Sequence, residues 1–467
     1  MAEKTHAAVA AGPQPQGTIM NIQTVETAFK NTLMVQQIMT CKIFPQKPED
    51  AGSIFRQKPQ QHSELPRSVN TFDINIETPR QLKNRVVLLR KTGLTSYLKR
   101  PTAVRVILAL QRSMSSGEEN DVVLQTVANK GIITLNRPKA LNALNVSMIR
   151  KIYPAMKKWE HEMSMVIIKG TGEKAFCAGG DVRALAEAGL KGDHTGKIFF
   201  REEYTLNALI GTYTIPYVAL IDGITMGGGV GLSVHGPFRV ATERTLFAMP
   251  ETTIGLFADV GGSHFLPRLG GKLGLYLALT GHRLKGVDCL KAGIATHFCE
   301  SSKLPELEKE LVNCKNPETD IKEILDRSTK ASKVESHVFS LAPHLEQIEK
   351  CFSAPTVEEI LLRLKKDGTE WAVRTVEILS KVSPTSCKVI KKELEEGVTK
   401  SLQECLIMEY RLGSHFCDRL EFYEGVRALL IDKDQNPKWN PPTLEEVTQE
   451  MVDYHFAALK PEEELKL

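Results

Sequence analysis

The chain has 467 residues, of which 42% are hydrophobic and 25% charged, and its formal net charge is +4. This length allows two or three domains with a sizeable core. No apolar run reaches the roughly 18 to 20 residues that span a bilayer, so we expect no membrane insertion. The nine cysteines occur singly, without a C-x-x-C pair or a Cys/His cluster. This pattern argues against a metal site and a disulfide framework, and favours a reducing compartment.

The positive charge is concentrated near the N-terminus. Residues 1–117 carry 16 lysines and arginines against 7 acidic residues, so the remainder is mildly acidic. Residues 1–79 show no sustained period, which predicts a disordered leader or a segment foreign to the natural protein. Residues 80–117 contain nine basic and no acidic residues and end in serines, the composition of a mitochondrial presequence. A solvated basic helix and an RNA-contacting arm are the alternatives.

From Asp121 onward, strands and helices are predicted to alternate, which is the layout of an α/β fold. VVLQTVANKGIITLN predicts two strands around an Asn-Lys-Gly turn. Residues 143–160 predict an amphipathic helix with a charged outer face. MVIIKG and YVALIDG predict short buried strands, and each of them leads into a glycine-rich turn.

The helical period dominates past residue 270. LGLYLALTG and CLKAGIATHF predict packed helices. Ser383 is a good N-cap, because Pro384 follows at the first helical position, and the predicted helix runs to about Glu396. We therefore expect a mostly helical C-terminal region.

Two glycine-rich turns follow predicted strands: CAGGD at residues 177–181 and GITMGGGVG at residues 223–231. Glycines expose backbone N–H groups to a cavity without a side chain in the way, so two such turns can supply two donors to one oxyanion. An isolated glycine run is more often a tight turn, but two runs at strand ends favour a site. Neither G-x-x-x-x-G-K-[ST] nor G-x-G-x-x-G occurs, so a nucleotide-binding loop is not supported.

The segment AMPETTIGLFADVGG, residues 248–262, carries two carboxylates among apolar and small residues. A loop made from it would bring Glu251 and Asp259 into a poorly hydrated place, where acids and bases acquire useful pKa values. A lone surface glutamate or a helix cap is the simpler interpretation of either residue. It weakens because both lie in so apolar a segment. Carboxylates next to an oxyanion hole indicate acyl chemistry.

These motifs, with NRPKALNAL, KAFCAGGD, FFREEY, SPTS and FYEGVRALLIDKDQNPKW, resemble those of the crotonase (enoyl-CoA hydratase/isomerase) superfamily over roughly three quarters of the chain. The resemblance implies an α/β fold of the ClpP/crotonase type, a spiral of β-β-α units. We expect a catalytic core at residues 118–320 and a helical C-terminal domain at residues 321–467. An oligomer is compatible with this family, but a C-terminal segment that folds back on its own subunit is equally so.

Within the superfamily the chain resembles thioester hydrolases that act on 3-hydroxyisobutyryl-CoA. The resemblance implies hydrolysis of that substrate, with 3-hydroxypropionyl-CoA as a second one, to the hydroxy acid and CoA in valine breakdown. It also implies a location in the mitochondrial matrix, an acyl-CoA as the ligand, no nucleic acid and no cofactor beyond substrate CoA. The alternatives are an enoyl-CoA hydratase/isomerase and a non-catalytic acyl-CoA-binding or RNA-binding homologue.

The resemblance also assigns roles to residues of the central motifs. The backbone N–H groups of Gly180 and Gly228 match the oxyanion hole. Glu251 matches the catalytic glutamate, either as a general base on water or as a nucleophile that forms a mixed anhydride. Asp259 matches a second carboxylate that orients water or protonates the departing thiolate. Ala258 stands where we expect proline, which predicts a less rigid backbone before Asp259.

Specificity is expected to come from two further positions. Glu203 matches a contact to the substrate hydroxyl, although Glu202 adjoins it and only one of the two can face the cavity of a helical segment. Hydratases of this fold carry a second catalytic glutamate where this chain has Gly231. Adding water across a double bond needs that pair, whereas thioester hydrolysis does not, so the sequence favours a hydrolase.

CoA is expected to lie along the loop after the first strand pair. Arg137, Lys139 and Ala140 in this loop, and Lys174 before the first glycine turn, are the candidate contacts. Lysines suit the phosphates of CoA because they are flexible point charges. Plain solvation is the simpler interpretation of exposed lysines.

Overall fold

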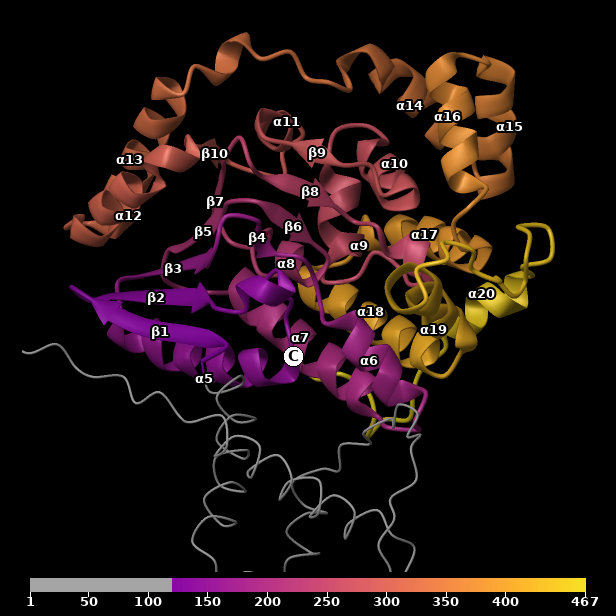
Figure 1. Cartoon of the computed structure of the whole chain (residues 1–467), viewed down its shortest axis with the longest axis horizontal. Helices are drawn as coiled ribbons and strands as arrows, with labels where there is room; N and C mark the ends of the chain where they lie inside the picture. Colours follow the sequence, from indigo (N-terminus) through magenta and orange to yellow (C-terminus); the bar gives the residue numbers. More distant parts are fainter. Residues whose placement is uncertain (1–119) are drawn as a thin grey trace, which may run out of the picture. The chain divides into compact units, whose positions relative to one another are not determined.

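The computed structural model describes residues 120–467, and the predicted leader and presequence-like segment lie outside the described residues (Figure 1). Two sheets form the centre of this part. The strands are β1 (Val122–Val127), β2 (Lys130–Leu135), β3 (Met165–Gly170), β4 (Ala175–Cys177), β5 (Tyr217–Ile221), β6 (Ile224–Met226), β7 (Phe238–Ala241), β8 (Leu246–Ala248), β9 (Leu284–Lys285) and β10 (His297–Phe298).

The two sheets are built alternately along the chain. One has the order β1-β2-β3-β5-β7-β10 and the other the order β4-β6-β8-β9. Strand β3 enters the first sheet and β4 the second, and the same step repeats for β5 and β6 and for β7 and β8. All neighbours are parallel except β1 with β2 and β8 with β9. Helices follow each strand pair, so the predicted β-β-α spiral is confirmed.

The helices are α5 (Val146–Glu162), α6 (Val182–Gly189), α7 (Thr195–Gly211), α8 (Gly228–Gly231), α9 (Gly262–Phe265), α10 (Leu273–Thr280), α11 (Val287–Lys291), α12 (Leu304–Asn313), α13 (Pro317–Ala331), α14 (Leu345–Phe352), α15 (Val357–Asp367), α16 (Glu370–Leu379), α17 (Pro384–Gly397), α18 (Leu402–Cys417), α19 (Leu420–Val426) and α20 (Gln449–Phe456). Short turns of 3-10 helix are η2 (Pro138–Ala140), η3 (Glu251–Ile254), η4 (Leu266–Arg268), η5 (Ser301–Lys303), η6 (Val334–Ser336) and η7 (Ala342–His344), and η8 (Arg427–Ile431) is π-helical. None of the helices between residues 120 and 467 has the length and apolar character needed to cross a bilayer.

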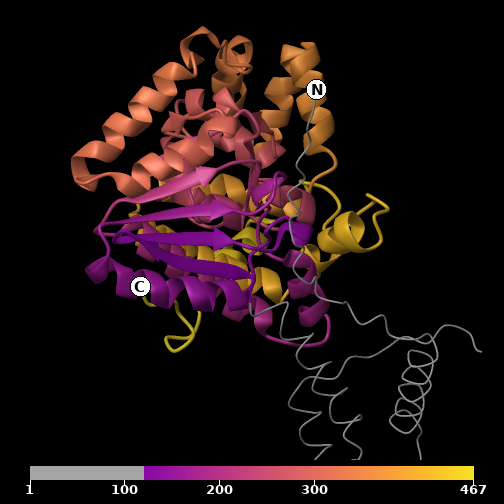
Figure 2. The same cartoon turned by 60° about the vertical axis from the view of Figure 1, so that its left-hand side comes forward.

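Both faces of the six-stranded sheet are covered, as the continuous apolar runs of its strands require. In β3 the side chains of Ile167 and Ile168 point to opposite faces and both are fully buried. Ile168 packs with the inner face of α5, and Ile167 with apolar residues of α12 and α13. Figure 2 shows α5 along one side of the purple strands and the salmon helices α12 and α13 along the other.

The first hairpin differs by one residue from the prediction. Val127 pairs with Lys130, so the loop consists of Ala128 and Asn129, both at positive φ. Such a two-residue loop matches the twist of the flanking strands. Gly131 lies inside β2, where a Cβ would come within 2.5 Å of the Trp159 ring. A glycine is therefore needed at position 131 because the Trp159 ring packs against the backbone there, and not because the turn requires it.

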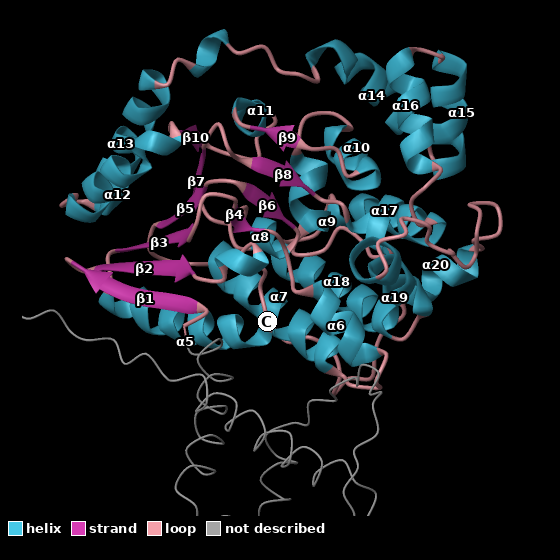
Figure 3. Cartoon of the chain, viewed as in Figure 1, coloured by secondary structure: helices cyan, strands magenta, loops and turns pink. Residues whose placement is uncertain are grey.

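After β10 the described chain contains only helices and loops (Figure 3). The predicted helix cap at Ser383 is confirmed, since its side chain accepts a hydrogen bond from the Ser386 N–H at 3.0 Å and Pro384 opens α17. The helix predicted from CLKAGIATHF is confirmed for its first three residues and wrong for the rest. Helix α11 ends at Lys291, and His297–Phe298 forms β10 because it completes the sheet beside β7.

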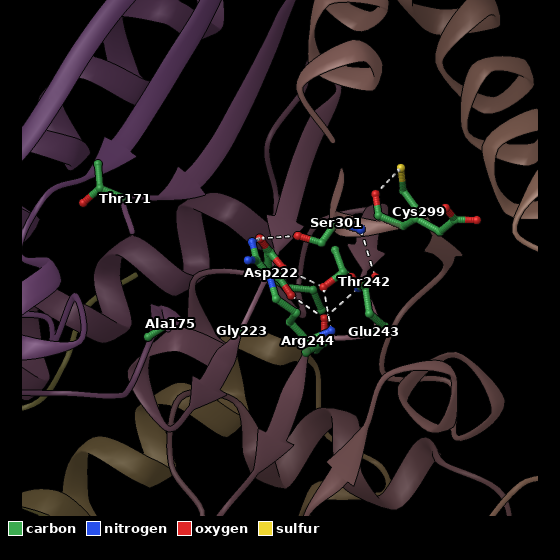
Figure 4. Close-up of polar contacts among 12 residues, drawn as sticks. Thr171, Ala175, Asp222, Gly223, Thr242, Glu243, Arg244, Cys299 and Ser301 are labelled. Atoms are coloured by element: carbon green, nitrogen blue, oxygen red, sulfur yellow. Dashed lines mark hydrogen bonds and ion pairs between the residues drawn. The ribbon is translucent and has the colours of Figure 1, made fainter. Parts of the chain in front are cut away.

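A polar cluster fixes the step from one sheet to the other (Figure 4). Asp222 directly follows β5 and accepts hydrogen bonds from Thr242 Oγ1 at 2.7 Å, Arg244 Nε at 2.9 Å and Ser301 Oγ at 3.2 Å. Burial raises the pKa of Asp222, but the bonds from Arg244 and Thr242 outweigh it and hold the pKa below its usual value. Gly223 then leads into β6 of the second sheet at φ +96°, where a Cβ would lie 2.6 Å from the Lys174 carbonyl oxygen.

Candidate active site

The two glycine turns meet at one edge of the second sheet. Gly180 follows β4 and Gly228 opens α8 after β6, and β4 and β6 are parallel neighbours. A Cβ at Gly228 would lie 3.3 Å from the Gly180 nitrogen. Within residues 120–467 neither amide donates a hydrogen bond. The structure therefore brings two unused donors together, as an oxyanion hole requires. Because α8 has only four residues, the amides themselves and not a long helix dipole supply this positive potential.

Glu251 opens η3, with two residues between it and the end of β8, and is 5% exposed. Its Oε1 lies 3.1 Å from the place that a Cβ at Gly227 would take, so the carboxylate borders the second glycine turn. Its Oε2 has no hydrogen-bond partner among the described residues. Burial, and then the charge of Asp259, raise the pKa of Glu251 well above its ordinary value.

Asp259 lies in the loop after η3 and is also 5% exposed. Tyr204 on α7 donates its hydroxyl proton to Asp259 Oδ2 at 2.9 Å. Burial raises the pKa of Asp259 to about 7, although the bond from Tyr204 lowers it. The negative charge of Asp259 in turn raises the pKa of Glu251. The quoted motif FFREEY contains Tyr204, but only the fold shows that it bonds Asp259.

Of the two adjoining glutamates on α7, Glu203 faces the site. It is 1% exposed, and a Cβ at Gly228 would lie 2.4 Å from its Oε1, which has no partner in the described residues. Glu202 points outward and forms a two-pronged ion pair with Arg150 at 2.6 to 3.1 Å. Burial first, and then Asp259, Glu251 and Glu409, raise the pKa of Glu203 well above its ordinary value.

Two buried carboxylates from the C-terminal helices complete the group. Glu393 on α17 accepts a hydrogen bond from the Ala258 N–H at 3.1 Å, and Glu409 on α18 accepts one from the Gly261 N–H at 2.7 Å. The sequence analysis missed both residues. A charged residue on the apolar face of a predicted helix was the available signal. The Ala258 bond is one that a proline could not make, so Glu393 holds the backbone where the expected proline is absent.

The candidate CoA contacts lie on two adjacent loops. Asn142 Nδ2 donates to the carbonyls of Thr171 and Ala175, both at 2.9 Å, and so joins the loop around η2 to the segment before the first glycine turn. Arg137 is engaged within the protein, because it pairs with Asp181 at 2.9 Å and donates to the Ala143 carbonyl at 2.6 Å.

The side chains of the remaining three candidates form no hydrogen bond or ion pair with the other described residues. Lys139 and Lys174 are exposed, and Ala140 is half-buried in η2. Arg137 therefore braces the loop, while the lysines keep their charges available to a ligand.

Gly231 has no room for a side chain. A Cβ there would lie 2.7 Å from Val260 Cβ and 2.8 Å from Asn207 Nδ2. Asn207 is fully buried, and neither of its side-chain polar atoms has a partner within residues 120–467. A glutamate at position 231 is therefore excluded sterically as well as by the sequence.

The chain is similar to proteins of known class. The sequence profile described as enoyl-CoA hydratase/isomerase matches residues 130–456. A Danio rerio protein named "3-hydroxyisobutyryl-CoA hydrolase, mitochondrial" is 57% identical over 372 residues, which cover 78% of this chain and 97% of the relative. A Gallus gallus protein of the same name is 59% identical over 343 residues, 73% of this chain and 89% of the relative. The crystal structure of a carnitinyl-CoA dehydratase from Mycobacterium thermoresistibile has a TM-score of 0.69 and 35% identity, and the match covers 74% of this chain and 98% of that one.

Proposed function

The chain belongs to the enoyl-CoA hydratase/isomerase family, and from this premise we propose that it hydrolyses the thioester of 3-hydroxyisobutyryl-CoA to the free hydroxy acid and CoA. The identity to relatives that bear this activity in their names, over almost their whole length, supports the proposal. The same names place the protein in the mitochondrion. One observation of the site carries the chemistry: the buried Glu251 borders the second of two adjoining glycine turns, whose Gly180 and Gly228 amides are unused within residues 120–467.

The oxyanion hole acts on the thioester carbonyl. Its oxygen accepts hydrogen bonds from the Gly180 and Gly228 N–H groups, and these bonds shorten as negative charge develops in the tetrahedral intermediate. One donor of this kind contributes about 3 to 4 kcal/mol to lowering the barrier. No cofactor takes part in this proposal, since donors and carboxylates all belong to the chain.

Glu251 acts by one of two routes. As a nucleophile, its carboxylate oxygen bonds to the thioester carbon, the C–S bond breaks, the thiolate takes a proton, and water then hydrolyses the anhydride. As a general base, it removes a proton from water, the hydroxide bonds to the same carbon, and the proton passes to the departing thiolate. A single turnover in ¹⁸O-water distinguishes the routes, because only the anhydride route can leave ¹⁸O in the Glu251 side chain.

The neighbouring groups divide the remaining tasks. Asp259, held by Tyr204, has a pKa raised to about 7 by burial, so it is able to carry the proton that the thiolate needs. Glu203 lies beside the oxyanion hole and offers its unpartnered Oε1 to the 3-hydroxyl of the substrate. A site built to bond a hydroxyl strongly rejects an analogue that lacks it. Lys139 and Lys174 attract the CoA phosphates.

The competing activity is hydration of an enoyl-CoA. It needs a second acid where this chain has Gly231, and the contacts of that position with Val260 and Asn207 leave no space for one. This observation favours hydrolysis.

The test is thiol release by the full chain from three substrates, with Glu251→Gln as the inactive variant. We expect fast release from 3-hydroxyisobutyryl-CoA, slow release from isobutyryl-CoA and none from crotonyl-CoA, with the substitution abolishing release. Water addition to crotonyl-CoA without any thiol release would return the protein to the hydratases. Equal rates on the hydroxylated and plain acyl substrates would remove the role given to Glu203.

A further inference from the structure

The turn that carries Asp259 has an unusual backbone. Val260, the next residue, is fully buried and has φ +55°, and Gly261 follows with φ +81°. Glycine adopts positive φ freely, but a β-branched residue rarely does, because its side chain crowds the backbone there. Surrounding contacts must therefore hold Val260 in this conformation. These two residues lead directly into helix α9.

Glu409 supplies most of those contacts. Its Oε2 accepts a hydrogen bond from the Gly261 N–H at 2.7 Å, and its Oε1 accepts bonds from the Ser263 N–H at 3.0 Å and Ser263 Oγ at 2.6 Å. The side chain is fully buried on α18, which packs against α7 and α9 (Figure 1). One carboxylate thus binds the turn on the far side of Val260 from Asp259.

Two further bonds hold the turn, one on each side of Asp259. Glu393 Oε1 accepts from the Ala258 N–H at 3.1 Å, and His235 Nε2 lies 2.7 Å from the Val260 carbonyl oxygen, to which it donates in the matching tautomer. Hydrogen bonds therefore hold the backbone at Ala258 and at Val260, the residues immediately before and after Asp259. The direction of the Asp259 side chain therefore depends on groups from the C-terminal helices.

We propose that Glu409 is a positioning residue of the active site, whose carboxylate keeps Val260 and Gly261 left-handed and so aims the Asp259 carboxylate at the Tyr204 hydroxyl. This inference rests on the hydrolysis proposed above. It makes the helices after residue 384 part of the active site and not only a cover for it. A carboxylate is needed because both of its oxygens accept bonds, whereas glutamine presents an NH₂ group to one of the backbone donors.

The first test is Glu409→Gln in the full chain, compared with Glu404→Gln on the same helix. Glu404 is a capping residue at the exposed start of α18, so its loss affects the helix end and not the turn. We expect Glu409→Gln to lower kcat by about 10- to 100-fold with KM within about threefold, because a small misplacement of a catalytic group is that costly. Glu404→Gln is expected to keep kcat within twofold. A Glu409→Gln enzyme that loses thermal stability but keeps kcat would overturn the proposal.

A double-mutant cycle with Val260→Gly tests the mechanism itself. Glycine needs no help to adopt positive φ, so in this background Glu409→Gln should lower kcat by less than about threefold. Both proteins of the glycine pair lack the valine side chain, so the effect of its loss cancels when their kcat values are compared. An equal loss of kcat with valine and with glycine would show that Glu409 does not act through the turn.

Ser263→Ala removes one of the three bonds and covers the case in which Glu409→Gln does not fold. We expect kcat to fall by about three- to tenfold, and an unchanged kcat would count against the proposal. Hydrogen exchange of residues 257–265 gives a readout that needs no substrate. Protection should fall at least tenfold in Glu409→Gln and stay constant in Glu404→Gln, and equal protection would overturn the proposal. If the wild-type chain releases no thiol, the proposed hydrolysis fails, while hydrogen exchange still decides the role of Glu409.

Discussion

Replacing Glu251 with glutamine is expected to lower activity and raise stability at the same time. Glutamine keeps the shape of the side chain but can act neither as base nor as nucleophile, so kcat should fall by about 10³-fold, which corresponds to about 4 kcal/mol of barrier. Thiol release from 3-hydroxyisobutyryl-CoA measures this loss. A kcat above one tenth of the wild-type value would refute the assignment of Glu251.

The stability change follows from burial. Glu251 is 5% exposed, and burial and Asp259 raise its pKa, so the folded protein keeps a proton that the unfolded chain releases above about pH 4.5. Wild-type stability therefore falls as pH rises toward the folded pKa, by about 1.4 kcal/mol per pH unit for one such group. Glutamine has no proton to lose, so the advantage of the variant should grow with pH.

The assay is thermal unfolding of both proteins at pH 5.5 and pH 8. We expect the variant to gain a few degrees in Tm at pH 8 and much less at pH 5.5. Glu202→Gln is the matched control, because the neighbouring glutamate of the pair on α7 is turned outward to Arg150. It should leave kcat unchanged and Tm nearly so, because an exposed ion pair contributes little. A lower Tm for Glu251→Gln at pH 8, or the same difference at both pH values, would refute the burial argument.

Gly228→Ala should reduce kcat by more than 10²-fold, because its Cβ would lie within the oxyanion hole, 2.4 Å from Glu203 Oε1. Gly270→Ala is the control in the same thiol-release assay. A Cβ at Gly270 would have no atom within 4 Å, so this variant should behave as wild type. Burial raises the pKa of Asp259 to about 7, so kcat/KM should fall as the pH rises through about 7 and Asp259 loses the proton that the thiolate needs, and a flat profile from pH 5.5 to 8 would contradict this. Lys139→Glu should raise KM for the CoA thioester several-fold without changing kcat, and Lys366→Glu, an exposed lysine on α15, should change neither. If both charge reversals raise KM equally, Lys139 has no specific role.

Much of the local structure was predictable, because local patterns specify it. The β3 strand at residues 165–170 and the Ser383 cap of α17 match the predictions, since an apolar run and an Asx-or-serine cap followed by proline act within a few residues. The errors lie where a distant partner decides. Residues 297 and 298 form a strand only because β7 is beside them, and Gly131 is not a turn residue because Trp159 packs against it.

The site divides in the same way. The order of residues along the chain specifies which chemical groups are present: two glycine turns, the carboxylates Glu251 and Asp259 eight residues apart in an apolar segment, and no acid at position 231. Those groups are recognisable because their spacing along the chain is short. Packing between distant elements turns Glu203 inward and brings Glu409 to Gly261 and Ser263, which lie 148 and 146 residues earlier in the chain. A contact of that separation leaves no periodic signal, because it forms only when two independently specified elements pack together.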